Sequence, residues 1–218
     1  MNLLAIDTAT ESCSAALWVD GKLYQKSTVQ PRLHAEFILP FIDELLEQAF
    51  IKKADIDGIV VGQGPGAFTG VRIGVAVAQG LALALDVPVL GVSNLTTLAF
   101  AASQHIDTQE PLSIVVATDA RMQEVYWARY VFFNAQLKRV TEEKVGPAST
   151  VDLKNCDVYI GSGFSVYSEL IKYAETKPMT FETNVYSFAK DMLLMVKDDF
   201  EKLAAKIESI EPVYLREP

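Results

Sequence analysis

The stretch "LLAIDTATESCSAALWVDGKLYQ" at residues 3–25 decides the fold, because its pattern occurs twice in the chain. An apolar run ends in Asp7, a short polar turn follows, and apolar and polar residues then alternate. The pair Asp20–Gly21 next predicts a tight turn between two antiparallel strands. Residues 113–137, "SIVVATDARMQEVYWARYVFFNAQL", repeat this order with Asp119 at the end of the apolar run. We therefore expect two related α/β halves, each opening with a three-stranded meander.

Helical spacing of apolar residues and short apolar runs predict the remaining elements. Pro40 lies inside one helical stripe and is expected to kink that helix, because proline removes a backbone donor. The expected strands are 56–61, 87–92 and 157–160, and the expected helices are 37–49, 70–85, 94–103, 166–173 and 187–207. The polar stretch 105–111 marks a boundary between lobes 1–105 and 106–218. The last segment of the second lobe is a candidate to return toward the first.

Composition limits the class of protein. The chain has 218 residues, half of them hydrophobic, which is enough for a substantial core. A net charge of −9 without a Lys/Arg cluster argues against direct nucleic-acid binding, which requires a basic surface. No signal peptide is recognisable, and the apolar run 73–85 is shorter than the roughly 20 residues of a membrane span. The two cysteines form no Cys-x-x-Cys motif. We expect a soluble, cytoplasmic protein without a membrane partner.

The stretch "GQGPGAFTGVRIG" at residues 62–74 is a glycine-rich loop before a helix, a place where anions often bind. It lacks the lysine of a P-loop, and its glycine spacing does not fit a dinucleotide-binding fingerprint. Phe68 projects from the loop, and Thr69 is the expected cap of the helix. Glycine costs about 1 kcal/mol relative to alanine in a helix. Glycines inside the helix, such as Gly74, therefore indicate that another backbone approaches closely.

The two aspartate turns are candidate nucleotide sites. Asp7, Thr8 and Thr10 offer a carboxylate and hydroxyls suited to a hydrated metal and phosphate oxygens. Asp119 and Arg121 occupy the equivalent place in the second half. Two such turns are typical of the actin, sugar kinase and Hsp70 superfamily. The alternative interpretation is that Asp7 and Thr8 only complete the backbone of a turn, and the sequence leaves both open.

Four blocks occur in order along nearly the whole chain: "LAIDTAT", "GPGAFTGVRIG", "DARMQEVYWA" and "EPVYLR". Together they resemble the TsaB (YeaZ) family of bacterial tRNA-modification subunits, although Ala67 stands where the commonest family form has serine. The resemblance implies an α/β, two-lobed actin-like fold with ribonuclease H-like lobes. It also implies an accessory subunit without catalytic residues. Such a subunit pairs with a TsaD-type transferase that forms threonylcarbamoyladenosine in tRNAs reading codons that begin with A.

The resemblance further implies partners and cofactors. The main partner is a TsaD-type paralogue, a TsaE-type ATPase joins a larger complex, and the chain forms a homodimer when alone. Contact with tRNA occurs only through the complex. This chain requires no cofactor, whereas ATP or ADP and a metal ion belong to the partner subunits. In the family, the helix after "FTGVRIG" and the preceding amphipathic helix form the dimerisation surface. The expected interface residues are His34, Phe37, Phe41, Phe68, Thr69, Arg72, Gly74 and Ala78.

Two other functions are compatible with parts of the sequence. An independent ATPase or small-molecule kinase of the same superfamily would depend on Asp7 and Asp119, but no convincing general base for an acceptor hydroxyl is found. A metallopeptidase needs a motif such as His-Glu-x-x-His, which is absent. The TsaD type carries a His-x-x-x-His metal pair, whereas here His34 stands alone on its helix and the second histidine, His105, is distant. We expect neither a metal site nor peptidase activity.

Overall fold

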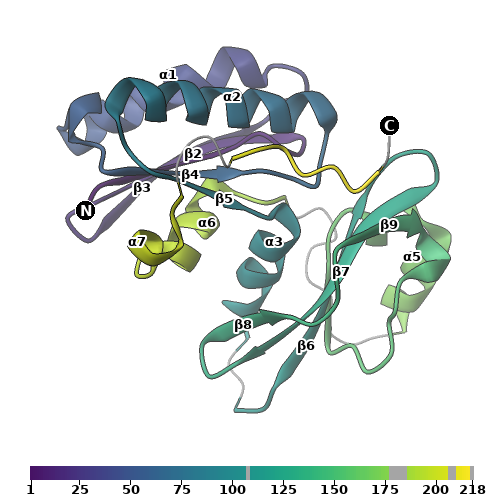
Figure 1. Cartoon of the computed structure of the whole chain (residues 1–218). Coiled ribbons are helices and arrows are strands. Elements are labelled where there is room, and N and C mark those ends of the chain that lie inside the picture. The colour runs from purple at the N-terminus through teal and green to yellow at the C-terminus, as the bar shows by residue number, and fades with distance from the viewer. Residues whose placement is uncertain (107–108, 177–185, 206–209, 217–218) are drawn as a thin grey trace. The chain divides into compact units, whose positions relative to one another are not determined.

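The computed structural model describes residues 1–106, 109–176, 186–205 and 210–216. The chain forms two compact units, the first made of Met1–Asn94 and Ser187–Val213 and the second of Leu95–Tyr186 and Tyr214–Pro218. Each unit contains one sheet with helices (Figure 1). The predicted boundary at residue 105 therefore differs from the observed one. The reason is that Leu95 and Leu98 of helix α3 (Asn94–Ser103) pack against the second sheet.

The sheet of the first unit has the strand order β3-β2-β1-β4-β5. Its strands are β1 (Leu3–Asp7), β2 (Ser12–Val19), β3 (Lys22–Val29), β4 (Gly58–Gly62) and β5 (Val89–Val92). The predicted turn is confirmed, because Asp20 and Gly21 have positive φ angles of 48° and 78°, as a tight two-residue hairpin requires. β1 pairs antiparallel with β2 and parallel with β4, so β1 lies in the middle of the sheet.

Helices cover both faces of this sheet, and β1 and β4 are consequently buried along their whole length (Figure 1). α1 (His34–Ala49) and α2 (Phe68–Leu85) cover one face. The short 3₁₀ helix Lys53–Asp55 follows α1 in the sequence. α1 continues through Pro40 as one helix. α6 (Ala189–Val196) and α7 (Phe200–Leu203) cover the other face.

The single long helix predicted for 187–207 is wrong within the described residues. α6 ends at Val196 and α7 begins at Phe200, with two aspartates in the intervening turn. Aspartate is a poor helix former, since its side chain competes for backbone hydrogen bonds. The break also lets Phe200 turn toward the sheet, where a Cβ at Gly58 would lie 2.3 Å from its ring. The end of the predicted helix, at 206–207, lies outside the described residues.

The sheet of the second unit has the order β10-β6-β7-β8, and β9 also pairs with β7. Its strands are β6 (Leu112–Asp119), β7 (Glu124–Phe133), β8 (Gln136–Arg139), β9 (Lys144–Pro147) and β10 (Val158–Ile160). The 3₁₀ helix Ala148–Thr150 and the helices α4 (Gly163–Val166) and α5 (Ser168–Glu175) complete the unit. One helix was predicted where α4 and α5 occur. The repeated meander is confirmed, and in each unit a parallel strand, β4 or β10, extends it beside the first strand.

Candidate functional site

α2 carries small residues on two different faces. The inner face consists of Gly70, Gly74, Ala78 and Ala82, all buried. A Cβ at Gly70 would lie 2.1 Å from the carbonyl oxygen of Thr8, and one at Gly74 would lie 2.7 Å from Thr8 Oγ1. These residues therefore let α2 approach β1 of the same chain. The prediction that Gly74 and Ala78 contact a partner is corrected by this burial.

The outer face of α2 points away from the sheet. It consists of the exposed residues Phe68, Thr69, Arg72, Ala76, Gly80, Leu83 and Ala84. Phe68 is 57% exposed and Leu83 is 75% exposed, so large apolar groups remain in contact with water. A Cβ at Gly80 would meet no atom of the described residues within 4 Å. Exposed apolar side chains on one helix face, with small residues between them, are typical of interaction sites. By length and composition α2 would also suit a membrane span, with a mean hydropathy of 1.6, but its inner face belongs to the core.

The first turn of α2 holds three of the predicted interface residues. The guanidinium of Arg72 lies 3.6 Å from the centroid of the Phe68 ring, a cation–π contact at the protein surface. Thr69 is not the helix cap, because the helix begins at Phe68 and Ala67 occupies the cap position without a side-chain bond. The backbone N–H of Ala67 instead donates to the carbonyl of Ala9 at 2.7 Å. The loop is thus fixed to the turn after β1.

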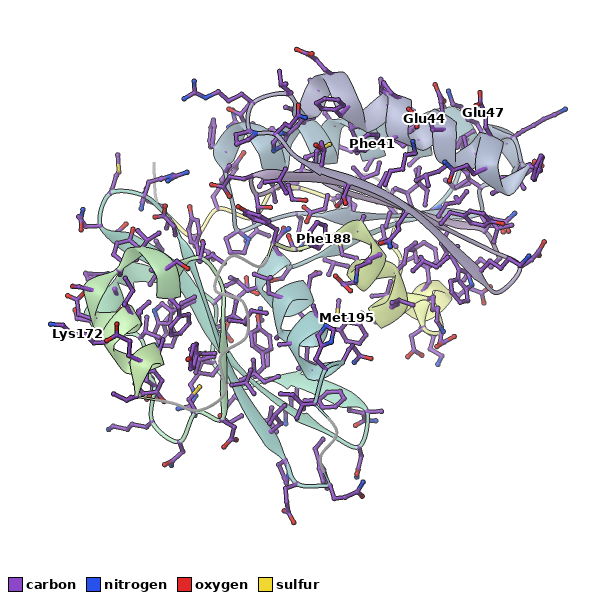
Figure 2. All side chains as sticks on the ribbon, turned by 180° about the vertical axis from the view of Figure 1, so that it is seen from behind. Phe41, Glu44, Glu47, Lys172, Phe188 and Met195 are labelled. Carbon is purple, nitrogen blue, oxygen red and sulfur yellow. The ribbon has the colours of Figure 1, made fainter. Side chains whose placement is uncertain are left out.

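The predicted residues of α1 divide between surface and interior. Phe37 and Phe41 are half-buried and stacked, with ring centroids 5.7 Å apart. His34 is buried, and its Nε2 lies 2.6 Å from the carbonyl oxygen of Thr10. His34 therefore joins the start of α1 to the β1–β2 turn, and its burial argues against the partner contact predicted for it. Figure 2 shows Phe41 on α1 together with the acidic residues Glu44 and Glu47.

Asp7 is completely buried, and its own chain uses both carboxylate oxygens. Oδ1 accepts bonds from the backbone N–H of Ala9 at 3.0 Å and from Asn94 Nδ2 at 2.9 Å. Oδ2 accepts a 2.5 Å bond from the Ser187 hydroxyl. Burial raises the pKa of Asp7 to about 6, although these three hydrogen bonds oppose the rise. The Thr8 hydroxyl donates to the carbonyl of Gly70 at 2.7 Å.

Asp7 and Thr8 thus offer no exposed oxygen to a metal ion or a phosphate. The structure favours the alternative interpretation, in which they complete the architecture of a turn, over their placement in a nucleotide site. Thr10 is half-buried, and its hydroxyl accepts a 3.3 Å bond from the backbone N–H of Ser12.

In the second unit Asp119 also stabilises its own turn. Its Oδ1 accepts bonds from the Tyr167 hydroxyl at 2.7 Å and from the backbone N–H of Arg121 at 2.8 Å. Its Oδ2 lies 2.8 Å from Arg121 Nη1, and the Arg121 side chain is 74% exposed. Burial, and then the bond to Asp119, raise the pKa of Tyr167 to about 12. Residues 121–123 all have positive φ angles, so the turn needs these contacts to hold a disfavoured backbone.

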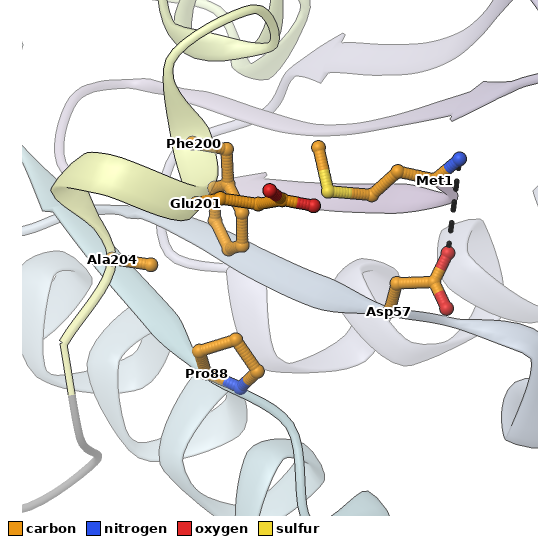
Figure 3. A pocket seen from close by; sticks show the side chains of 6 residues that line it. All are labelled: Met1, Asp57, Pro88, Phe200, Glu201 and Ala204. Carbon is orange, nitrogen blue, oxygen red and sulfur yellow. Dashed lines mark ion pairs between the residues drawn. The ribbon is translucent and has the colours of Figure 1, made fainter.

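An open pocket of about 460 Å³ lies elsewhere in the first unit (Figure 3). It is lined by Met1, Asp57, Pro88, Phe200, Glu201 and Ala204. The terminal amine of Met1 lies 4.0 Å from the Asp57 carboxylate. No predicted site residue lines this pocket, so it does not belong to the candidate interface.

A family model described as "TsaD: tRNA N6-adenosine threonylcarbamoyltransferase" matches residues 26–211. The tRNA threonylcarbamoyladenosine biosynthesis protein TsaB of Escherichia coli (strain K12) is 37% identical, over 99% of this chain and 95% of that protein. The chain belongs to the TsaB (YeaZ) family. The TsaB protein of Haemophilus influenzae is 35% identical, over 99% of this chain and 94% of its own length.

Solved structures agree with this family assignment. YeaZ from Pseudomonas aeruginosa superposes with a TM-score of 0.84 at 36% identity, covering 98% of this chain and 99% of that one. A second Pseudomonas aeruginosa structure, described as similar to peptidase YEAZ, gives a TM-score of 0.85 at 37% identity, with 99% of each chain covered. The resemblance inferred from the four sequence blocks and the actin-like fold that it implied are both confirmed.

Four residues of the α2 outer face and of the Asp7 cluster were not assigned to these places from the sequence. Gly80 was counted among the small residues of the helix but was not separated from Gly74, and Leu83 was not singled out, although helical periodicity places both away from Gly74 and Ala78. Asn94 and Ser187 were not connected with Asp7, because no local pattern links residues so distant in sequence.

Proposed function

We propose that this chain is a non-catalytic accessory subunit of the machinery that forms threonylcarbamoyladenosine in tRNAs reading codons that begin with A. It pairs with a TsaD-type transferase through the outer face of α2. The names of its relatives support the pathway, since they are described as tRNA threonylcarbamoyladenosine biosynthesis proteins. Pairing through α2 is supported by its exposed apolar outer face, which has Gly80 near its centre.

Gly80 is the most informative residue of the outer face. A glycine in an exposed helix costs about 1 kcal/mol relative to alanine, and no atom of the residues that the structure describes approaches close enough to require one here. Ala76, Gly80 and Ala84 follow each other at intervals of four residues, which places them along one line of the helix. Such a line lets the backbone of a partner helix approach closely. Burying Leu83 beside it would contribute roughly 1.5–3 kcal/mol.

The same face serves the homodimer that we propose for the isolated chain. A two-fold symmetric dimer uses one patch on both copies, so this face is occupied in the dimer. Pairing with the TsaD-type paralogue and self-pairing then exclude one another. The transferase must displace the second copy of this chain.

The accessory role also agrees with the chemistry of Asp7. Its carboxylate oxygens bind groups of the same chain, so the residue expected to hold a metal and phosphate is used for architecture. We propose that this chain requires no cofactor and that ATP or ADP and a metal ion act in the TsaD-type and TsaE-type subunits. The net charge of −9 supports contact with tRNA only through the complex. We place the complex in the cytoplasm, where tRNA modification takes place.

Reconstitution tests this function. The TsaD-type and TsaE-type proteins of the same organism are incubated with a threonylcarbamoyl donor and unmodified tRNA, with and without this chain. We expect product only when this chain is present, and neither product nor ATP turnover from this chain alone. Product formation that is equal without the chain, or ATP turnover by the pure chain, would contradict the accessory role.

A further inference from the structure

The chain passes between its two units three times, and each crossing has one residue of the first unit at its border. These residues are Asn94, Ser187 and Val213, which border the segments of the second unit. Asn94 and Ser187 both bind Asp7, through Nδ2 to Oδ1 at 2.9 Å and through Oγ to Oδ2 at 2.5 Å. Asn94 Nδ2 also donates to Ser187 Oγ at 2.8 Å. One carboxylate therefore holds two of the three crossings.

The third crossing, at Val213, is connected to Asn94 through Gln63 and Gly64, which follow β4. The backbone N–H of Val213 donates to the carbonyl of Gln63 at 2.7 Å. The N–H of Gly64 donates to Asn94 Oδ1 at 2.8 Å, and the N–H of Asn94 donates back to Gly64 O at 3.0 Å. Gly64 has a φ of +99°, and a Cβ there would lie 3.0 Å from the carbonyl oxygen of Val213. A side chain at this position would disturb both connections.

Every side-chain N–H and O–H of Asn94 and Ser187 in this cluster has a hydrogen-bond acceptor. Asn94 Nδ2 uses its two hydrogens for Asp7 and Ser187, and the Ser187 hydroxyl gives its one hydrogen to Asp7. A buried carboxylate is costly unless it is fully hydrogen-bonded, and removing one partner leaves a buried polar group unsatisfied. An apolar side chain at residue 7 would fill the space but would accept no hydrogen bond from Asn94 or Ser187.

We infer that Asp7, Asn94 and Ser187 form a crossing anchor, in which the aspartate fixes the points where the chain leaves and re-enters the first unit. Asp7 acts here as a positioning residue and not as a ligand of nucleotide or metal. Loss of its carboxylate removes the acceptor that Asn94 Nδ2 and the Ser187 hydroxyl share, and it weakens the hold on Val213 through Gly64 and Gln63. The range of orientations open to the second unit then widens, while the core of each unit keeps its packing.

Spin labels on the two units test this inference in the full chain. Gln25 and Lys172 are exposed in the first and second unit, and cysteines placed there can be labelled selectively. The native thiols are buried, and burial raises the pKa of Cys13 to about 12 and of Cys156 to about 11, so they react slowly. Double electron–electron resonance then gives the distribution of distances between the labels.

We expect Asp7→Ala to broaden this distribution and to speed hydrogen exchange at the amides of Gly64, Asn94 and Val213 at least tenfold. The matched control is Ser14→Ala, which removes a buried 3.0 Å bond from the Ala189 N–H in the same unit but touches no crossing residue. It should leave the distribution unchanged.

A folded Asp7→Ala protein whose distance distribution matches the wild type would overturn the inference. If Asp7→Ala does not fold, Ser187→Ala is the deciding variant, because it removes the two bonds that the Ser187 hydroxyl makes with Asp7 and Asn94 and leaves the carboxylate in place. Ser187→Ala is expected to give an intermediate broadening, and a distribution equal to that of Ser14→Ala would equally overturn it.

Discussion

A Cβ atom at Gly74 would lie 2.7 Å from the Oγ1 of Thr8, so the absence of a side chain at residue 74 sets how closely α2 packs on β1. Thr8 Oγ1 donates to the carbonyl of Gly70, one turn earlier in the same helix. The inner face of α2 is therefore fixed by a hydrogen bond as well as by close contact. Substitutions on the two faces of this helix should have opposite consequences.

Gly74→Leu is expected to destabilise the isolated chain. Overpacking a core typically costs 1–3 kcal/mol, and here the new side chain must also displace Thr8 and break its bond. Urea unfolding measures the change. A wild-type midpoint for Gly74→Leu would show that the inner face is less tightly packed than described.

Gly80→Ala is the matched control on the outer face, since it changes the same residue type in the same helix. Among the residues that the structure describes, its methyl group meets no atom within 4 Å, and alanine favours a helix by about 1 kcal/mol over glycine. We expect a slightly higher unfolding midpoint, measured under conditions where the chain is monomeric. A marked loss of stability would contradict the exposure of this position.

The fold was predictable where its signals are local. Asp20–Gly21 specifies the hairpin turn by itself, and the meander around Asp119 repeats the first one closely enough to reveal two related halves. The orientation of α2 was not predictable in the same way. Small residues occur on both of its faces, and the spacing alone does not say which face meets the sheet of its own chain.

The role of Asp7 depends on contacts that no sequence pattern announces. Ser187 lies 180 positions further along the chain, and Asn94 lies 87 positions further. An aspartate at the end of a strand fits both a phosphate site and an architectural cluster. The two roles are distinguished by the hydrogen bonds that Asn94 and Ser187 donate to its carboxylate oxygens.

The buried carboxylate makes stability depend on pH. Because burial raises the pKa of Asp7 from 3.8 to about 6, the folded state binds a proton more readily than the unfolded state between these values. The contribution of Asp7 to stability is complete below about pH 4 and is lost as the pH rises through about 6. The difference corresponds to roughly 3 kcal/mol.

Asp7→Asn removes this titration, so wild type should lose stability relative to Asp7→Asn between pH 4 and pH 7. The measurement is the free energy of unfolding of both proteins across this range, from which groups common to both cancel. Parallel profiles would show that Asp7 has the same pKa in the folded and unfolded states.

Phe68→Ala should weaken pairing and leave the fold intact. The ring is 57% exposed, so its loss costs the monomer little, whereas a buried aromatic at an interface contributes at least about 1–2 kcal/mol. We expect roughly tenfold weaker association by analytical ultracentrifugation. Phe133→Ala, an exposed phenylalanine of the second unit, is the control and should pair normally. Equal effects of the two substitutions on association would contradict the assignment of the interface to α2.

The most direct test is the affinity of Gly80→Leu for the TsaD-type paralogue, measured by isothermal titration calorimetry beside wild type. Gly80 has open space around it, so the variant should fold with near wild-type stability. We expect leucine to keep the partner helix at a distance and to weaken binding at least a hundredfold, because a side chain fills the line of closest approach. Binding of Gly80→Leu with wild-type affinity would contradict the claim that this chain acts through the outer face of α2.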